Sequence, residues 1–284
     1  MDTRERTEVL ENPDVSIVVV NYNVRRLMLD CLWSIYHRED RGMSIETIVV
    51  DNGSSDDSVT AIETHYPQVI LIKNSENKGF PAANNQAFRI AKGKYIMMLN
   101  PDTQLIGNAL ALMKKCLDKN PDVALVGPKM LSPNRTVQFS IFHFPKVLDI
   151  AAEMMYMNFL IRKKYYLKSG FDSPIEVDSV SGAAMMFRSE LLGRIGALNE
   201  YLFWIEDVDF CYRIRKSGMK ILYLPEAKVL HHIGKSAEKN YDVAIHNQIT
   251  NKVRFYKVHH GKLATAAVVL LSFLNAISKL ALLA

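Results

Sequence analysis

The sequence lacks the glycine-rich turns that hold phosphate groups in many nucleotide-binding proteins. The first predicted strand, Val15–Val20, is followed by Asn21, Tyr22 and Asn23, and this turn contains no glycine. A dinucleotide site needs G-x-G-x-x-G at this point so that the backbone can approach the pyrophosphate, and a P-loop needs its own glycines and lysine. The absence argues against a nicotinamide-dependent dehydrogenase and against a P-loop enzyme.

Cysteine is scarce, and the N-terminus has no apolar run. Cys31, Cys116 and Cys211 are far apart among 284 residues, and no C-x-x-C pair occurs. This pattern argues against a zinc site or a disulfide framework, and it fits a reducing compartment. The first 12 residues are charged, so we expect no signal peptide.

The chain has no large net charge of either sign. Lysine and arginine number 35 against 30 acidic residues, which gives a net charge of +5, and 49% of the residues are hydrophobic. This composition predicts a globular protein with one large domain or two small ones. The basic residues do not form a nucleic-acid-binding motif, so we expect no nucleic-acid partner. The mild excess of positive charge suits an anionic ligand or a membrane surface.

The first half of the chain alternates apolar runs with segments of helical period. This β-α-β order predicts an α/β fold with a mostly parallel central sheet and helices on both faces. The predicted strands lie at residues 15–20, 45–50, 69–72 and 95–99. In the second half, helices are predicted at 109–117 and from 206 to Gly218, and strands at 123–126, 177–180, 183–187 and 221–224.

Each of the first four strands ends in a polar cluster. Because the carboxyl ends of parallel strands meet at one edge of a sheet, and ligands bind at that edge, four such clusters predict a nucleotide site. Asp102 follows the fourth strand and lies between Asn100 and Thr103. These oxygen ligands suit Mg²⁺ or Mn²⁺ carrying a diphosphate. The alternative is a turn in which Asp102 caps the next helix.

Together the clusters resemble a family 2 glycosyltransferase of the GT-A fold, and most closely its rhamnosyltransferase-like branch. The matching segments are Val-Val-Asn-Tyr-Asn at 19–23, Val-Asp-Asn-Gly-Ser-Ser-Asp at 50–56, Asn-Lys-Gly-Phe at 77–80 and Leu-Asn-Pro-Asp at 99–102. The likeness extends roughly from Val15 to Ser236 and implies a Rossmann-like nucleotide-binding half followed by an acceptor-binding half. We therefore expect a tail at 1–14, a GT-A domain at 15–262 divided into a nucleotide-sugar half (15–126) and an acceptor and catalytic half (127–262), and a membrane-associated helix at 263–284.

The resemblance also implies roles for the strand-end residues. Tyr22 would stack on the nucleotide base and Asp51 would accept the ring N–H of uracil or thymine, as their chemistry allows. The metal-binding D-x-D of the family is Asn-Pro-Asp here, which makes Asp102 the metal ligand. Asn85 either lies near the donor or is a helix-surface amide. The implied donor-binding set is Asn21, Tyr22, Asn23, Asp51, Asn77, Gly79, Asn85 and Asn100.

A second chemical centre begins at Glu206. Glu206, Asp207 and Asp209 lie among aromatic and aliphatic residues, where carboxylates are costly unless they are paired or functional. From the residues alone, the acids cap a helix, and Asp209 pairs with Arg213 four positions on. The resemblance instead implies that Asp207, with Glu206 beside it, is the catalytic base, and that Gly182, Ala183 and Trp204 adjoin the sugar and acceptor.

A histidine motif and two apolar segments complete the sequence. The resemblance places His231, in H-x-x-G-x-S, beside the metal and diphosphate, with Lys235 and Ser236 on phosphate oxygens. The apolar stripe from Val147 to Phe159 is either a core helix or an amphipathic membrane segment. Residues 263–284 are long enough to cross a bilayer. However, Thr265, Ser272, Asn275, Ser278 and Lys279 share one face, which fits an interfacial helix or a helix that packs on a partner.

These features predict an inverting, metal-dependent glycosyltransferase. The expected donor is dTDP-rhamnose or a UDP-sugar, the cofactor Mg²⁺ or Mn²⁺, and the acceptor a polyprenyl-diphosphate-linked glycan in cell-surface polysaccharide synthesis. Basic residues before the last helix place the enzyme on the cytoplasmic face of the cell membrane. One alternative is a catalytically inactive protein of the same fold that binds nucleotide sugar. Another is a nucleotidyltransferase, which would need a glycine-rich basic loop after the first strand.

Overall fold

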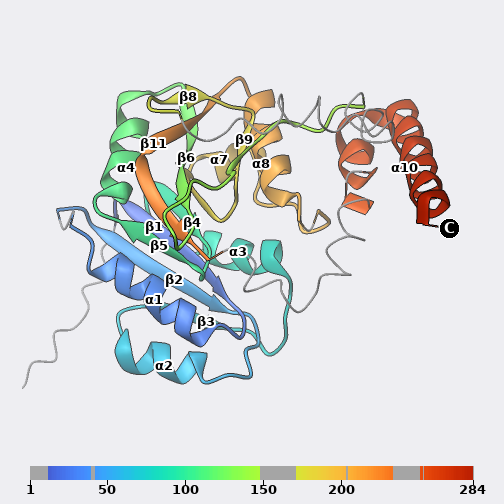
Figure 1. The fold of residues 1–284 in the computed structure, drawn as a ribbon. Coiled ribbons are helices and arrows are strands. Elements are labelled where there is room, and N and C mark those ends of the chain that lie inside the picture. The colour runs from blue at the N-terminus through green and yellow to red at the C-terminus, as the bar shows by residue number, and fades with distance from the viewer. Residues whose placement is uncertain are drawn as a thin grey trace, which may run out of the picture.

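Among the described residues, nine strands form a mixed sheet at the centre of the molecule (Figure 1). The computed structural model describes residues 12–39, 42–147, 171–202, 204–232, 250–251 and 253–283. Lys235, Ser236 and all of the 147–159 stripe after Val147 therefore lie outside the described residues.

The first four strands of the sheet run parallel, as the sequence predicts. They are β1 (Val15–Asn21), β2 (Ile45–Asp51), β3 (Ile70–Lys73) and β4 (Tyr95–Leu99), in the spatial order β3-β2-β1-β4. Beyond β4 the order continues with β10 (Ala184–Arg188), β6 (Val123–Leu131), β11 (Lys220–His231) and β5 (Thr103–Ile106), and β8 (Ile175–Glu176) pairs with β11. Because β6 and β11 run in the direction of β4 while β10 runs against it, the sheet is mainly parallel.

Helices cover both faces of this sheet, as predicted from the alternating order. In β1, Ile17 and Val19 point into one apolar cluster, and Val18 and Val20 point into the other, as expected when side chains alternate across a strand. The first cluster includes residues of α1 (Arg25–Tyr36), α2 (Ser58–His65) and α4 (Ala109–Lys119). The second includes residues of α3 (Phe80–Phe88), α7 (Leu191–Ile195) and α8 (Glu206–Lys216).

The prediction of one strand at 177–180 is wrong in its extent. The chain forms β8 before Val177 and then a separate two-residue strand, β9 (Ser179–Val180), which pairs with β7 (Ile141–Phe142). Asp178 interrupts the run and accepts a hydrogen bond from His143, at 2.8 Å from Nδ1. Short β5 was not predicted at all, because its four residues are fixed by pairing with distant β11.

Strand register brings the predicted polar clusters to one edge. Asn21 and Asp51 are direct neighbours where β1 and β2 end, and Ala184 of antiparallel β10 faces Leu99 of β4. His231, at the end of β11, faces Thr103 of β5. Residues from both halves of the sequence therefore meet beyond the carboxyl end of β4.

The C-terminal helix, α10 (Gly261–Leu283), lies to one side of the molecule, away from the sheet (Figure 1). Its residue Val268 packs against Phe255 and Tyr256 of the preceding helical segment. Among the residues described, no helix is sufficiently long and apolar to span a bilayer.

Candidate active site

A cavity of about 250 Å³ opens at the carboxyl edge of the sheet. Its walls come from the end of β4, the turn before β10, the start of α8 and the end of β11. Seven residues that the sequence singled out line it, namely Asn100, Gly182, Ala183, Trp204, Glu206, Asp207 and His231, together with Phe80 and Ser181. The structure thus brings together the two chemical centres that the sequence predicted separately.

Asp207 is held in the cavity by backbone hydrogen bonds. Its Oδ2 accepts from the Gly182 N–H at 2.8 Å, and its Oδ1 accepts from the Val208 N–H at 2.7 Å. Burial raises the pKa of the Asp207 carboxyl, and these two N–H groups oppose that rise by stabilising the carboxylate. The result is a fixed acceptor with a basicity above that of an ordinary aspartate.

Glu206 differs from its neighbour in having an unsatisfied oxygen. The side chain is buried, and its Oε2 accepts no hydrogen bond from the residues described. Burial, and secondarily the charge of Asp207, raises the pKa of Glu206 to about 8. The protonated form of Glu206 is thus favoured near neutral pH, because two adjacent carboxylates in a largely dry site do not readily ionise together.

Trp204 enters the site in a strained conformation. Its φ is +73°, a left-handed value that non-glycine residues rarely adopt, and 43% of its surface is exposed. Such strain persists where surrounding structure enforces it, and it clusters at functional sites. The turn places the indole at the cavity immediately before α8 begins.

Two buried oxygen atoms lie unsatisfied beside His231. Asp102 is 3% exposed, and neither its Oδ1 nor the Oδ1 of Asn100 accepts a hydrogen bond from the described part of the chain. The Nε2 atom of His231 lies 3.5 Å from Asp102 Oδ1, too far for a strong hydrogen bond. Buried polar atoms without partners are rare in folded proteins, so this group fits a cation-binding role.

Gln138, which the sequence did not indicate, fixes the ring of His231. Its Nε2 donates to the His231 carbonyl at 2.7 Å, so its Oε1 faces the ring and accepts from Nδ1 at 3.0 Å. Nδ1 therefore donates to Gln138, and Nε2 faces Asp102. Metal-binding histidines are commonly oriented by such a second hydrogen bond. No local motif marks Gln138, because 93 residues separate it from His231.

The predicted base-binding residues form a network at the ends of β1 and β2. The Nδ2 of Asn21 donates to Asp51 Oδ1 at 2.8 Å, and Asp51 Oδ2 accepts from the Ser54 N–H. The Oδ1 of Asn23 accepts from the Ser55 N–H at 2.7 Å and so ties the two turns together. Tyr22 is 43% exposed beside them. Asn21 and Asn23 therefore shape the turns, and Tyr22 presents an accessible ring.

The next turn is organised by Asn52. Its Nδ2 donates to Asn77 Oδ1 at 2.8 Å, and its own Oδ1 accepts from the Lys78 N–H at 3.0 Å. Asn77 in turn accepts from the N–H of Gly79, whose φ of +84° suits glycine. The sequence marked Asn77 and Gly79, but the hydrogen bonds show that buried Asn52 sets their positions.

Asn85 links α3 to the loop before α8. It is 5% exposed, and it exchanges hydrogen bonds with the backbone N–H and C=O of Leu198 and donates to Glu200. The alternative of a helix-surface amide is therefore wrong.

The chain matches known proteins over most of its length. The sequence profile of the family described as "Glycosyl transferase family 2" matches residues 16–196, more than half of the chain. The chain belongs to glycosyl transferase family 2. An N-acetylglucosaminyl-diphospho-decaprenol L-rhamnosyltransferase of Mycobacterium tuberculosis is 26% identical over 242 residues, which are 79% of this chain and 78% of that protein. A dTDP-rhamnosyl transferase, RfbF, of Shigella flexneri is 24% identical over 258 residues, 88% of this chain and 79% of that protein.

The fold of this family 2 glycosyltransferase is GT-A, as predicted. The mannosyltransferase PcManGT from Pyrobaculum calidifontis, solved in complex with GDP-Man and Mn²⁺, matches it with a TM-score of 0.62 at 21% identity. The match covers 95% of this chain and 74% of that one. Two of the curated relatives are rhamnosyltransferases, which confirms the resemblance to that branch.

Gly182→Ala is expected to reduce transfer by the glycosyltransferase about 10²-fold by moving the carboxylate of Asp207. A Cβ on Gly182 would lie 3.0 Å from Asp207 Cβ and 3.1 Å from Met98 Cε, which is too close without a shift. Initial rates of transfer measure the effect. Gly193→Ala is the matched control, because nothing lies within 4 Å of its added Cβ. Equal rates for the two variants would show that the Gly182 turn does not set the position of Asp207.

Glu206→Gln is expected to flatten the pH dependence of stability. The folded protein holds the Glu206 proton up to a pKa of about 8, whereas the unfolded chain releases it near the ordinary value of 4.5. The free energy of unfolding should therefore fall as pH rises between these values, by up to about 1.4 kcal/mol per pH unit from this group. Urea denaturation at both ends of the range measures this slope. Exposed Glu190→Gln is the control, and an unchanged slope in Glu206→Gln would contradict the assignment.

Proposed function

We propose that this family 2 glycosyltransferase inverts the anomeric centre as it transfers a sugar from dTDP-rhamnose or a UDP-sugar to a hydroxyl of a lipid-linked glycan, in cell-surface polysaccharide synthesis. The observation that carries the proposal is the cavity in which Asp207, fixed by the Gly182 N–H, shares walls with Asn100 and His231. The activities of the two rhamnosyltransferase relatives support the choice of donor, and the decaprenol-linked substrate of one of them supports the choice of acceptor.

Asp207 acts as the general base in this proposal. It accepts the proton of the acceptor hydroxyl while that oxygen forms a bond to the anomeric carbon, and the bond from that carbon to the diphosphate oxygen breaks. Attack from the face opposite the leaving nucleoside diphosphate inverts the configuration. The two backbone N–H donors orient the carboxylate for this transfer, and its raised pKa brings its basicity closer to working pH.

Asp102, His231 and Asn100 fit a divalent cation. The unsatisfied Oδ1 atoms of Asp102 and Asn100 are hard oxygen donors suited to Mg²⁺ or Mn²⁺, and the oriented Nε2 of His231 adds a nitrogen donor. When bound, such a cation neutralises the charge of the departing diphosphate. The described residues contain no group of three or more His, Cys, Asp and Glu side chains able to hold a metal alone. Oxygen atoms of the donor diphosphate would complete the coordination, as is usual for Mg²⁺.

Tyr22 and Asp51 select the nucleotide base. The exposed ring of Tyr22 would stack on a pyrimidine, and each Asp51 oxygen keeps a lone pair beyond its bond within the chain. We also propose that the enzyme lies on the cytoplasmic face of the cell membrane, because Arg254 and Lys257 precede α10, Lys262 lies at its start, and basic flanks favour that side.

A panel of nucleotide sugars, with and without lipid extract as acceptor, tests the function. We expect free UDP or dTDP to appear only from the matching donor, and faster with the extract, whereas GDP-sugars should bind weakly by calorimetry. Binding of a donor without turnover, on any acceptor, would indicate an inactive nucleotide-sugar-binding protein. Release of pyrophosphate in place of a nucleoside diphosphate would indicate a nucleotidyltransferase.

A further inference from the structure

The α10 helix has one face packed on the protein and one face of exposed apolar side chains. The packed face includes Ala264, Val268 and Leu271, which adjoin Phe255 and Tyr256. The exposed side chains recur at intervals of three and four residues, so they form a continuous outward stripe along the helix. The outward stripe consists of Leu263, Ala266, Val269, Leu270, Phe273 and Leu274.

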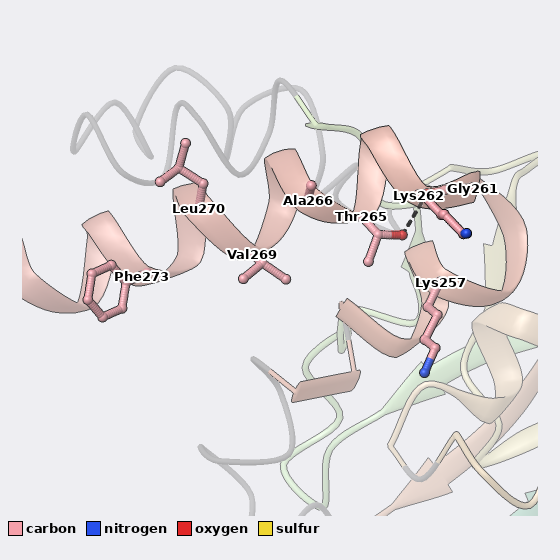
Figure 2. A pocket seen from close by; sticks show the side chains of 8 residues that line it. All are labelled: Lys257, Gly261, Lys262, Thr265, Ala266, Val269, Leu270 and Phe273. Carbon is pink, nitrogen blue, oxygen red and sulfur yellow. Dashed lines mark hydrogen bonds between the residues drawn. The ribbon is translucent and has the colours of Figure 1, made fainter.

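The outward stripe is unusual in its degree of exposure. Leu263 is 90% exposed, Phe273 62% and Leu270 58%. Val269 and Phe273 point to the same side of the helix and border an open groove of about 700 Å³ (Figure 2). A contiguous apolar surface of this kind marks an interaction site in proteins.

Positive charge lies at one end of the outward stripe. Lys257 and Lys262 border the same groove, and their ammonium groups lie near the N-terminal end of α10 (Figure 2). Both lysines are exposed. An apolar helical face with lysines at its margin matches a bilayer surface, in which acyl chains lie beneath anionic headgroups.

We propose that α10 docks on an anionic lipid surface, with the outward stripe in the acyl boundary and Lys257 and Lys262 among the headgroups. The inference rests on the proposed function in one respect, because docking would bring the enzyme to its lipid-linked acceptor. The docking itself requires no catalytic activity. Binding to lipid and transfer of sugar can therefore fail independently.

Sedimentation of the full chain with vesicles tests the proposal. We expect binding to phosphatidylcholine vesicles that contain phosphatidylglycerol, and weaker binding to phosphatidylcholine alone. The double variant Leu270→Glu/Phe273→Glu should lose binding. Lys257→Gln/Lys262→Gln should lose about fivefold for each charge on the anionic vesicles only. Trp33→Glu, which alters a 58% exposed aromatic side chain on α1, is the matched control and should bind normally.

Three outcomes would overturn the proposal. Binding that survives the double substitution would show that the outward stripe does not contact lipid. A dimer that the double variant dissociates, with no vesicle binding by the native chain, would identify a subunit interface. Retention in the membrane after alkaline carbonate would identify a spanning helix. Transfer to a soluble acceptor, measured on the same samples, separates each outcome from failure of the catalytic proposal.

A second inference rests on a different observation, the buried carboxylate of Asp209 in the first turn of α8. Its side chain is fully buried. Oδ2 accepts from the guanidinium of Arg213, at 2.9 Å from Nε, and Oδ1 accepts from His259 Nε2 at 2.6 Å. The predicted Asp209–Arg213 pair is therefore present, and His259 was not predicted. His259 also packs against Tyr212 of α8, with ring centroids 4.6 Å apart.

We infer that His259 is a positioning residue for the proposed base. His259 lies in the segment that leads into α10. Its hydrogen bond to Asp209, two residues after Asp207, holds the first turn of α8 in place. Loss of this hydrogen bond leaves a buried oxygen unsatisfied and frees the turn to shift. A small displacement of a catalytic group is enough to slow a reaction.

Three variants test the role of His259 in the full-length protein. His259→Phe keeps the ring but removes the donor, and it should lower kcat about tenfold with little change in donor KM. His259→Gln keeps a donor and should restore most of kcat. His260→Phe, the neighbouring control, should retain native kcat. A purely structural role would lower the melting temperature of His259→Phe while kcat well below that temperature stayed native, and this result would overturn the inference.

Discussion

Asp207→Asn should lower the rate of sugar transfer by about 10²–10⁴-fold, the contribution of a positioned general base. Asparagine keeps the size of the side chain. Its single amide oxygen can accept the hydrogen bond from the Gly182 N–H, which is 2.8 Å long in the native protein, while the Val208 N–H loses its side-chain acceptor. Asparagine has no carboxylate to take the proton of the acceptor. Donor affinity should change little, because Tyr22 and Asp51 lie on other strand ends. Single-turnover transfer measured beside donor affinity separates the two effects.

Glu206→Gln is the matched comparison for this variant. Glu206 already holds its proton near neutral pH, so replacing it with an amide changes its charge little there. We therefore expect a smaller loss of transfer. If Glu206→Gln abolishes transfer and Asp207→Asn does not, the base is Glu206. If both variants bind the donor poorly, the acid pair serves binding or folding in place of proton transfer.

Asp102→Ala should remove nearly all turnover that depends on added Mg²⁺ or Mn²⁺. It deletes a carboxylate whose Oδ1 accepts no hydrogen bond among the described residues, so the fold should survive the change. Calorimetric titration with Mn²⁺ in the presence of nucleoside diphosphate gives a second readout, which does not require transfer. We expect the binding heat of the native protein to be lost in the variant.

Asp122→Ala is the control for the loss of a carboxylate. Asp122 forms a surface ion pair with Lys220 at 2.7 Å, where β6 and β11 begin, whereas the cavity lies at the carboxyl edge of the sheet. Its removal should leave both metal binding and transfer unchanged. Full activity of Asp102→Ala in EDTA would refute the assignment of Asp102 as a metal ligand.

Much of the fold was accessible from the sequence because parallel strands have a simple signature. Apolar runs such as 15–20 and 95–99 are fully buried on both faces, and each ends in side chains that the sheet must bring to one edge. The pairing of Asn21 with Asp51 follows from that geometry. The joint location of Asp207 and His231 did not follow from any local pattern, and only the resemblance to a family pointed to it.

The remaining features depend on contacts between distant segments. The four residues of β5 carry too little pattern to predict a strand, and its partner lies more than a hundred residues away. The left-handed φ of Trp204 has no sequence signature, because a non-glycine residue adopts it only under tertiary constraint. Gln138 and His259 act through side-chain hydrogen bonds to partners remote in the sequence, and such bonds become visible only when the side chains are placed.

One of the hydrogen bonds between walls of the cavity uses backbone atoms alone. The N–H of Asn100 donates to the carbonyl of Ala183 at 2.8 Å, so the position of residue 100 does not depend on its side chain. The side chain at position 100 can therefore change without any change in this backbone hydrogen bond. An aspartate there would recreate the two-carboxylate pattern of the wider family at an unchanged location. Over evolutionary time, the cation preference at this edge of the sheet can thus change while the backbone around position 100 stays the same.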